Sequence, residues 1–174
     1  KIIAIIEAIN EWAGRFAAWS IFLMVIITFL VVVFRYGIQG LYSIAFQESA
    51  MYFHAFAFLL GASYTLKHND HVRVDIFYQN FSEKQKAYVD LLGTTVFLIP
   101  FCLFILWVSA DYVAASWQSL EGSRETGGLP FVFILKTTIP IFAILLLLQG
   151  VAQILRAVLQ LTTTPSTTSS QSSL

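Results

Sequence analysis

The sequence predicts an all-α membrane protein with four transmembrane helices and an N-terminal amphipathic interfacial helix. Four stretches without a charged side chain, each 18 to 20 residues long, occupy residues 16–34, 49–66, 91–110 and 137–155. Roughly 20 residues are needed for a helix to cross a hydrocarbon core of ~30 Å. Of the 174 residues, 57% are hydrophobic and 11% charged, whereas a soluble domain carries about 25% charged residues.

The first 16 residues show a helical pattern that differs from the spans. Apolar side chains recur at intervals of three and four residues, while most charged side chains fall off this stripe. The stripe contains Ile2, Ile5, Ile9, Trp12 and Phe16. Such a pattern is typical of an amphipathic helix that lies in the membrane interface. The alternative is that the segment extends the first span beyond the membrane as a stem.

The membrane domain is expected over residues 17–160, with spans at about 16–35, 47–67, 88–110 and 130–156. Ser82 and Gln85 form a capping-box pattern before the third span. Gly127, Gly128 and Pro130 predict a turn that places the proline in the first turn of the fourth span. Two further prolines, at positions 100 and 140, are expected to bend their helices. Residues 161–174 are mostly Thr, Ser, Gln and Pro, which predicts a disordered tail.

The distribution of Lys and Arg predicts the orientation, because cytoplasmic loops of membrane proteins carry an excess of these residues. In a four-span chain, segments 1–15, 67–90 and 156–174 share one side of the membrane. They hold seven of the ten Lys and Arg residues, and the opposite side holds three. Both termini are therefore expected in the cytoplasm.

Charged side chains lie near the ends of the spans, where they cost less than at the bilayer centre. Arg35 closes the first span and Glu48 opens the second, so an ion pair between them is expected on the periplasmic side. Asp111 and Lys136 are expected to pair across the third and fourth spans. The first pair is interpreted as orienting adjacent helices, with a direct role in partner binding as the alternative, and the second as structural rather than catalytic.

One face of the second span combines Glu48 with small and aromatic residues at helical spacing. It holds Glu48, Tyr52, Ala55, Leu59 and Ala62, with Ala57 and Gly61 on a nearby face. Small residues let neighbouring transmembrane helices approach closely. This span is therefore predicted to be a packing helix, against its own chain or against another subunit.

No motif for catalysis, cofactor binding or nucleic-acid binding is present. Phosphate-binding glycine loops, zinc motifs and a nucleophile elbow are absent from the sequence, and ten basic residues balance ten acidic ones. The single cysteine, Cys102, is interpreted as a small buried apolar residue. His54, the histidine well inside a span, is interpreted as a hydrogen-bonded packing residue, with a proton-relay role as the alternative. We expect no cofactor.

A composite pattern surrounds the second span. It reads Arg35-Tyr36, Gln47-Glu48, Leu60-Gly61-Ala62 and His71-Val72-Arg73-Val74-Asp75. In this order and spacing the chain resembles, over about residues 10 to 160, the DctQ-like small membrane subunit of tripartite ATP-independent periplasmic (TRAP) transporters. One departure is that this chain lacks the tryptophan and the paired acidic residues that the family often has at the start of the second span, so Glu48 stands alone.

The resemblance implies a scaffold subunit in the bacterial inner membrane. Its partners would be a large membrane subunit that holds the substrate and sodium sites, a periplasmic solute-binding protein and membrane lipids, with no nucleic acid. The transported solute would be an organic acid or a related compound. Candidates for the subunit interface are Arg35, Glu48, Tyr52, Ala55, Gly61 and Ala62.

Two further sets of residues receive a role on this interpretation. Candidates for docking the binding protein are Trp117, Glu121, Arg124 and Glu125, with a plain connecting loop as the alternative. His71, Arg73 and Asp75 are expected to anchor their loop at the cytoplasmic membrane surface. The competing functional hypothesis is an autonomous oligomeric four-span channel or proton-coupled carrier.

Overall fold

A computed structural model describes residues 1–37, 42–68 and 81–163, and every regular element in these ranges is a helix. The elements are α1 (Ile2–Tyr36), α2 (Ile44–Lys67), α4 (Glu83–Gly93), the π-helical turn η1 (Thr94–Leu98), α5 (Ile99–Gln118) and α6 (Val132–Thr163). Because α4, η1 and α5 follow one another without a break, they form one long helix from Lys84 to Gln118. The all-α prediction is confirmed.

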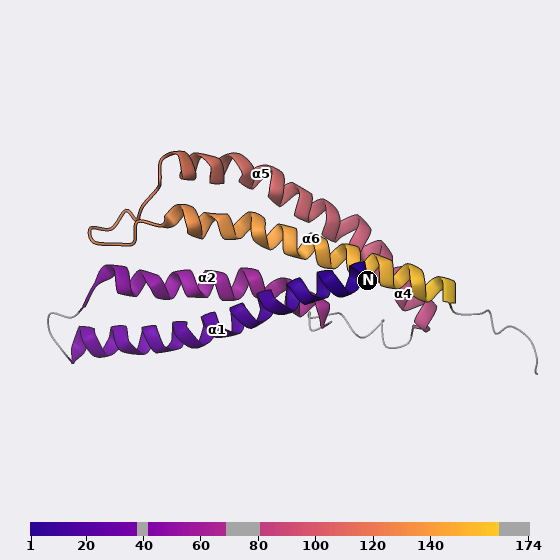
Figure 1. Cartoon of the computed structure of the whole chain (residues 1–174), viewed down its shortest axis with the longest axis horizontal. Coiled ribbons are helices and arrows are strands. Elements are labelled where there is room, and N and C mark those ends of the chain that lie inside the picture. Colours follow the sequence, from indigo (N-terminus) through magenta and orange to yellow (C-terminus); the bar gives the residue numbers. More distant parts are fainter. Residues whose placement is uncertain (38–41, 69–80, 164–174) are drawn as a thin grey trace, which may run out of the picture.

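The long helices lie side by side in an elongated array (Figure 1). Their contacts order them α1, α2, α6 and α5, and α5 packs chiefly on α6. The N-terminus, α4 and the end of α6 gather at one end of the array, which we call the terminal end. The opposite end, the loop end, holds the α5–α6 loop together with the last turn of α1 and the first turn of α2 (Figure 1).

Burial in this array is the reverse of that in a soluble protein. Small residues such as Ala143 and Ala152 are fully buried, and so are the polar side chains of Asn10 and Gln149. Large apolar side chains point outward, with Trp107 77% exposed and Phe97 75% exposed. This distribution suits a bilayer, in which lipid tails accept bulky apolar groups and small residues let helices pack closely.

The N-terminal segment is not a separate helix, which corrects our expectation of a distinct interfacial helix over residues 1–16. Helix α1 runs unbroken from Ile2 to Tyr36, as in the alternative that the segment continues the first span. The stripe that includes Trp12 and Phe16 is exposed, whereas the opposite face, with Ile6 and Asn10, packs inward. Because no glycine–proline break separates the two patterns, the helix continues through both.

Three helices are long and apolar enough to cross a membrane in the described part of the chain. They are Ile2–Tyr36, Lys84–Gln118 and Val132–Thr162. Helix α2 is not among them. It carries His54, Ser63, Tyr64 and Thr65 on a 24-residue helix, so its composition is more polar than that of the others. The expected fourth span is thus not established by length and composition.

The helix signals in the sequence have mixed outcomes. The capping box before α4 is confirmed, because Gln85 N donates to Ser82 Oγ and Ser82 N donates to Gln85 Oε1. Gly127 adopts a left-handed φ of 81° in the expected turn. Pro130, however, precedes the first residue of α6, Val132, rather than lying in its first turn.

The two prolines inside helices affect them differently. Before Pro100 the chain widens into the π-helical turn η1, in which Ile99 N donates to Thr94 O. This wider turn gives the proline ring the room that a regular turn would deny it. Pro140 lies inside α6, which continues on both sides of it. Cys102, two residues after Pro100, is fully buried as predicted.

Candidate functional site

The loop between α5 and α6 is held against α2 by a single carboxylate at the loop end. Glu48, in the first turns of α2, accepts hydrogen bonds from Ser123 Oγ and, at 2.7 Å, from Leu129 N. Gly128 allows this close approach, because a β-carbon there would lie 2.7 Å from Glu48 Oε2. One side chain of α2 therefore holds the loop at two points, although the loop starts 71 residues later, at Ser119.

A second carboxylate in the loop, Glu121, joins α5 to α6. It accepts hydrogen bonds from Ser116 Oγ at 2.7 Å and from Lys136 Nζ at 2.5 Å. The Lys136 ammonium also lies 4.0 Å from the centroid of the Tyr112 ring. The hydrogen bond from Lys136, followed by that from Ser116, holds the pKa of the Glu121 carboxyl below its usual value.

Both expected ion pairs at this end are therefore wrong. Arg35 stacks over the rings of Tyr36 and Tyr42, with its guanidinium 5.8 and 5.7 Å from their centroids, while Glu48 binds the loop. Lys136 pairs with Glu121 rather than with Asp111. Pairing by position in the spans failed because it treated the loop as a passive connection, whereas the loop supplies the nearest partners.

The docking candidates differ in exposure, since Glu121 is half-buried and the other three are exposed. Glu121 is engaged in the contacts described above, whereas Arg124 and Glu125 are exposed. Trp117 donates from Nε1 to Thr137 Oγ1 at 2.8 Å and packs edge-on against Phe133, yet remains 47% exposed. The loop thus presents two free charged side chains beside a fixed aromatic ring.

Leu120 is a docking candidate that the sequence did not reveal. Its φ is +46°, and it is the one non-glycine residue with a positive φ in the described ranges. Glu121 N donates to Ser116 O around it, which is the pattern of a helix C-terminus that usually places glycine at this position. Its side chain is 65% exposed. Because residues held in strained backbone conformations often lie at functional sites, the exposed Leu120 side chain is a candidate for contact with a partner.

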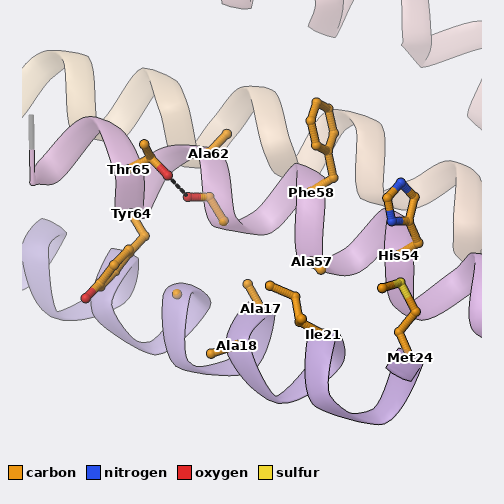
Figure 2. Close-up of a pocket in the computed structure, with 12 residues that line it drawn as sticks. Ala17, Ala18, Ile21, Met24, His54, Ala57, Phe58, Ala62, Tyr64 and Thr65 are labelled. Atoms are coloured by element: carbon orange, nitrogen blue, oxygen red, sulfur yellow. Dashed lines mark hydrogen bonds between the residues drawn. The ribbon is translucent and has the colours of Figure 1, made fainter. Parts of the chain in front are cut away.

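A groove of about 760 Å³ runs between α1 and α2 (Figure 2). Its walls are mostly small side chains, and its ends carry larger ones. The lining residues are Gly14, Ala17, Ala18, Ile21, Met24, His54, Ala57, Phe58, Gly61, Ala62, Tyr64 and Thr65. We call this the α1–α2 groove.

Two glycines bring the walls of the groove together. A β-carbon at Gly14 would lie only 2.8 Å from the β-carbon of Tyr64, so α1 passes directly against this tyrosine. At Gly61 an added β-carbon would meet Ala17 at 3.5 Å, an ordinary packing distance. Gly61, a subunit-interface candidate, thus lies beside Ala17 of the same chain and also lines the groove with Ala57 and Ala62.

The other interface candidates lie in different surroundings. Tyr52 is buried and packs edge-on against Phe56, and its hydroxyl has no hydrogen-bond partner within the described ranges. Ala55 is half-buried, and Arg35 is exposed at the end of α1. The six candidates therefore do not form one surface, and their role in subunit contact stays a prediction.

The terminal end contains a polar cluster that the sequence reasoning missed. Asn10 Nδ2 donates to Gln149 Oε1 at 2.7 Å, and both side chains are almost wholly buried between α1 and α6. Lys67 Nζ lies 2.6 Å from Glu11, and Arg156 pairs with Glu7. The only sequence signal was the four-residue spacing of the two glutamates on α1.

Residues 69–80 lie outside the described ranges, so the proposed membrane-surface anchor at His71, Arg73 and Asp75 has no structural outcome. In the described part of the chain, no three His, Cys, Asp or Glu side chains lie together in a way that would hold a metal ion. What the described residues offer is a set of contact surfaces: a fixed loop at one end and a groove along one side.

Comparison with known proteins assigns the chain to a family. No curated protein and no solved structure matches the chain. The family model of the tripartite ATP-independent periplasmic transporters, DctQ component, matches residues 24–160, which include the C-terminal part of α1 and all of the other described helices up to the last turn of α6. This match covers well over half of the chain, so the protein belongs to the DctQ family, the small membrane subunit of TRAP transporters.

Proposed function

We propose that this subunit is a scaffold that braces the large membrane subunit through the α1–α2 groove and helps dock the periplasmic binding protein at the loop end. Membership of the family places the chain in a tripartite transporter with those two partners. The assembled transporter is proposed to couple sodium to uptake of an organic acid or a related solute across the bacterial inner membrane.

The proposed topology has four spans with both termini in the cytoplasm. Helix α2 has 24 residues, so at 1.5 Å per residue it extends about 36 Å, enough to cross the hydrocarbon core. It runs beside α1 in the opposite direction (Figure 1), and α1 is one of the three helices suited to a membrane. The excess of Lys and Arg at the terminal end supports a cytoplasmic location for that end.

The single observation that carries the scaffold role is the α1–α2 groove. Lipid tails are as apolar as leucine, so helices associate in a bilayer mainly through close packing and hydrogen bonds. A concave surface lined by Ala18, Ala57 and Ala62 permits such close packing with a further helix. A fixed wall of this kind would support a neighbour that moves during transport.

The test is to fill the groove and measure retention of the large subunit. Ala57→Trp and Ala62→Trp place bulk in the groove, whereas Leu103→Trp, on the exposed face of α5, is the matched control. We expect both groove variants to lose the large subunit in affinity purification from mild detergent, and the control to retain it.

Two results would contradict the proposal. Full retention by both groove variants would remove the groove from the contact. Purification of the wild-type chain as a homo-oligomer without any large subunit would instead favour the autonomous channel or carrier.

A further inference from the structure

We propose that His54 forms a hydrogen bond with a polar side chain of a transmembrane helix of the large subunit that occupies the α1–α2 groove. The inference rests on the proposed scaffold function and adds to it the chemistry and depth of the contact. It predicts that the occupying helix presents small residues along the groove and one hydrogen-bonding side chain near the middle of the membrane.

The first step is the depth of His54. It is the eleventh residue of α2, so it lies about 15 Å along a helix that extends about 36 Å. In a bilayer whose hydrocarbon core is ~30 Å thick, that position is near the centre. No water is available there to satisfy a polar group.

The second step is the surroundings of the imidazole. His54 is exposed at one end of the groove, and Figure 2 shows it opposite Met24 of α1, with its ring directed away from that helix. Within the described ranges no side chain or backbone group hydrogen-bonds to it, and the thioether of Met24 is only a weak acceptor. A polar group left unpaired in hydrocarbon is costly, so the group that covers His54 should bond to it.

The third step is that the other polar side chains of the groove do not need a hydrogen-bond partner near the middle of the membrane. The Thr65 hydroxyl donates to Gly61 O at 3.0 Å within α2, a contact visible in Figure 2. Tyr64 lies at the end of the groove near the terminal end, where its ring stacks with His68. His54 is therefore the side chain that sets a chemical requirement on the occupant at membrane depth.

The fourth step distinguishes the occupant. A lipid chain fits an apolar groove but offers no hydrogen-bonding group at the depth of His54. The exposed side chains of Phe97 in η1 and of Phe101 and Leu103 in α5 are bulky and wholly apolar, so lipid covers them without leaving a polar group unpaired. A polar transmembrane helix satisfies both the shape of the groove and the imidazole, and the family supplies a polytopic partner.

The experiment compares His54→Leu with His54→Gln in the complex purified from membranes that also contain the large subunit. Leucine removes the hydrogen bond, whereas glutamine retains a donor and an acceptor at a similar distance from the helix. We expect His54→Leu to weaken retention of the large subunit by about three- to twentyfold, the range for interhelical hydrogen bonds in membranes, and His54→Gln to stay within about twofold of wild type. Trp107→Leu on α5 is the control.

A photocrosslinking residue at position 57, one turn from His54, identifies the occupant. We expect a crosslink to a large-subunit peptide that contains a polar residue. A crosslink only to lipid or to a second copy of this chain would overturn the inference, as would equal retention by the leucine and wild-type chains. If Ala57→Trp abolishes retention but His54→Leu does not, the groove contact stands and only the role of His54 fails.

Discussion

Glu48 shows how one side chain decides the shape of a surface 70 residues away. Its two carboxylate oxygens receive the Ser123 hydroxyl and the Leu129 amide, so the loop is fixed at both of its ends. Hydrogen bonds to a charged acceptor are stronger than those between neutral groups. A preformed loop loses less conformational entropy when a partner binds it, which favours docking.

Acid should release the second attachment of the loop, at Glu121. The pKa of this carboxyl is lowered in the folded protein by its hydrogen bond from Lys136. Its stabilising contribution is therefore fully present above the usual glutamate pKa of 4.5 and is lost as pH falls through the lower folded value. Hydrogen exchange of residues 119–131 should be constant from pH 7 to pH 5, after correction for intrinsic rates, and should accelerate in stronger acid.

Glu121→Gln is the matched variant for this pH dependence. Because the amide does not titrate, the acid-induced acceleration of exchange in its loop should be smaller than in the wild-type chain. An identical acid response in the variant would mean that another group controls the loop.

Leu120→Gly should weaken binding of the periplasmic protein to the loop without making the loop less stable. Glycine adopts the left-handed conformation without the clash that costs a leucine about 1 kcal/mol, so the loop should become no less stable. Removal of an exposed apolar side chain should nevertheless weaken binding of the periplasmic protein severalfold, measured by titration of the purified complex. Unchanged binding would assign the strain at Leu120 to the helix end alone.

At the scale of the elements, α1 is held to α6 by a buried amide pair, in addition to the more exposed ion pair between Glu7 and Arg156. Asn10 and Gln149 are almost fully buried, and the Asn10 Oδ1 atom has no partner within the described ranges. Leucine at either position alone leaves the other amide unpaired. We expect the two substitutions to be coupled by about 0.6 to 1.7 kcal/mol, the usual range between membrane helices.

A double-mutant cycle measures this coupling. Asn10→Leu, Gln149→Leu and the double variant are unfolded in detergent micelles by increasing denaturant. The double variant should be more stable than the sum of the single losses predicts. Strict additivity would show that the pair does not connect α1 and α6 energetically.

For the whole molecule, the proposed orientation is tested by labelling single cysteines. The native Cys102 is fully buried, so it should stay unlabelled and provide the background. In intact spheroplasts, a membrane-impermeant maleimide should label Glu125→Cys in the loop but reach Thr162→Cys, at the end of α6, only after lysis. The reverse pattern would invert the topology and move the loop to the cytoplasm.

The sequence by itself determined the class of the protein and the main helices. Runs of 18 to 20 uncharged residues require helices in a bilayer, because the backbone has no other way to satisfy its amides there. The composite sequence pattern around the second span resembles that of the TRAP small subunit, and the family match confirms that assignment. Local signals such as the Ser82 capping box were also sufficient, since their chemistry lies within four residues.

Only the tertiary structure decided which charged groups meet and which face of each helix is covered. Glu48 bonds to the loop rather than to Arg35, and Lys136 to Glu121 rather than to Asp111, because partners distant in sequence compete with local ones. Gly61 lies beside Ala17 and lines the groove with Ala62, an arrangement set by how α1 crosses α2. Periodicity defines the faces of a helix, but the fold determines what each face contacts.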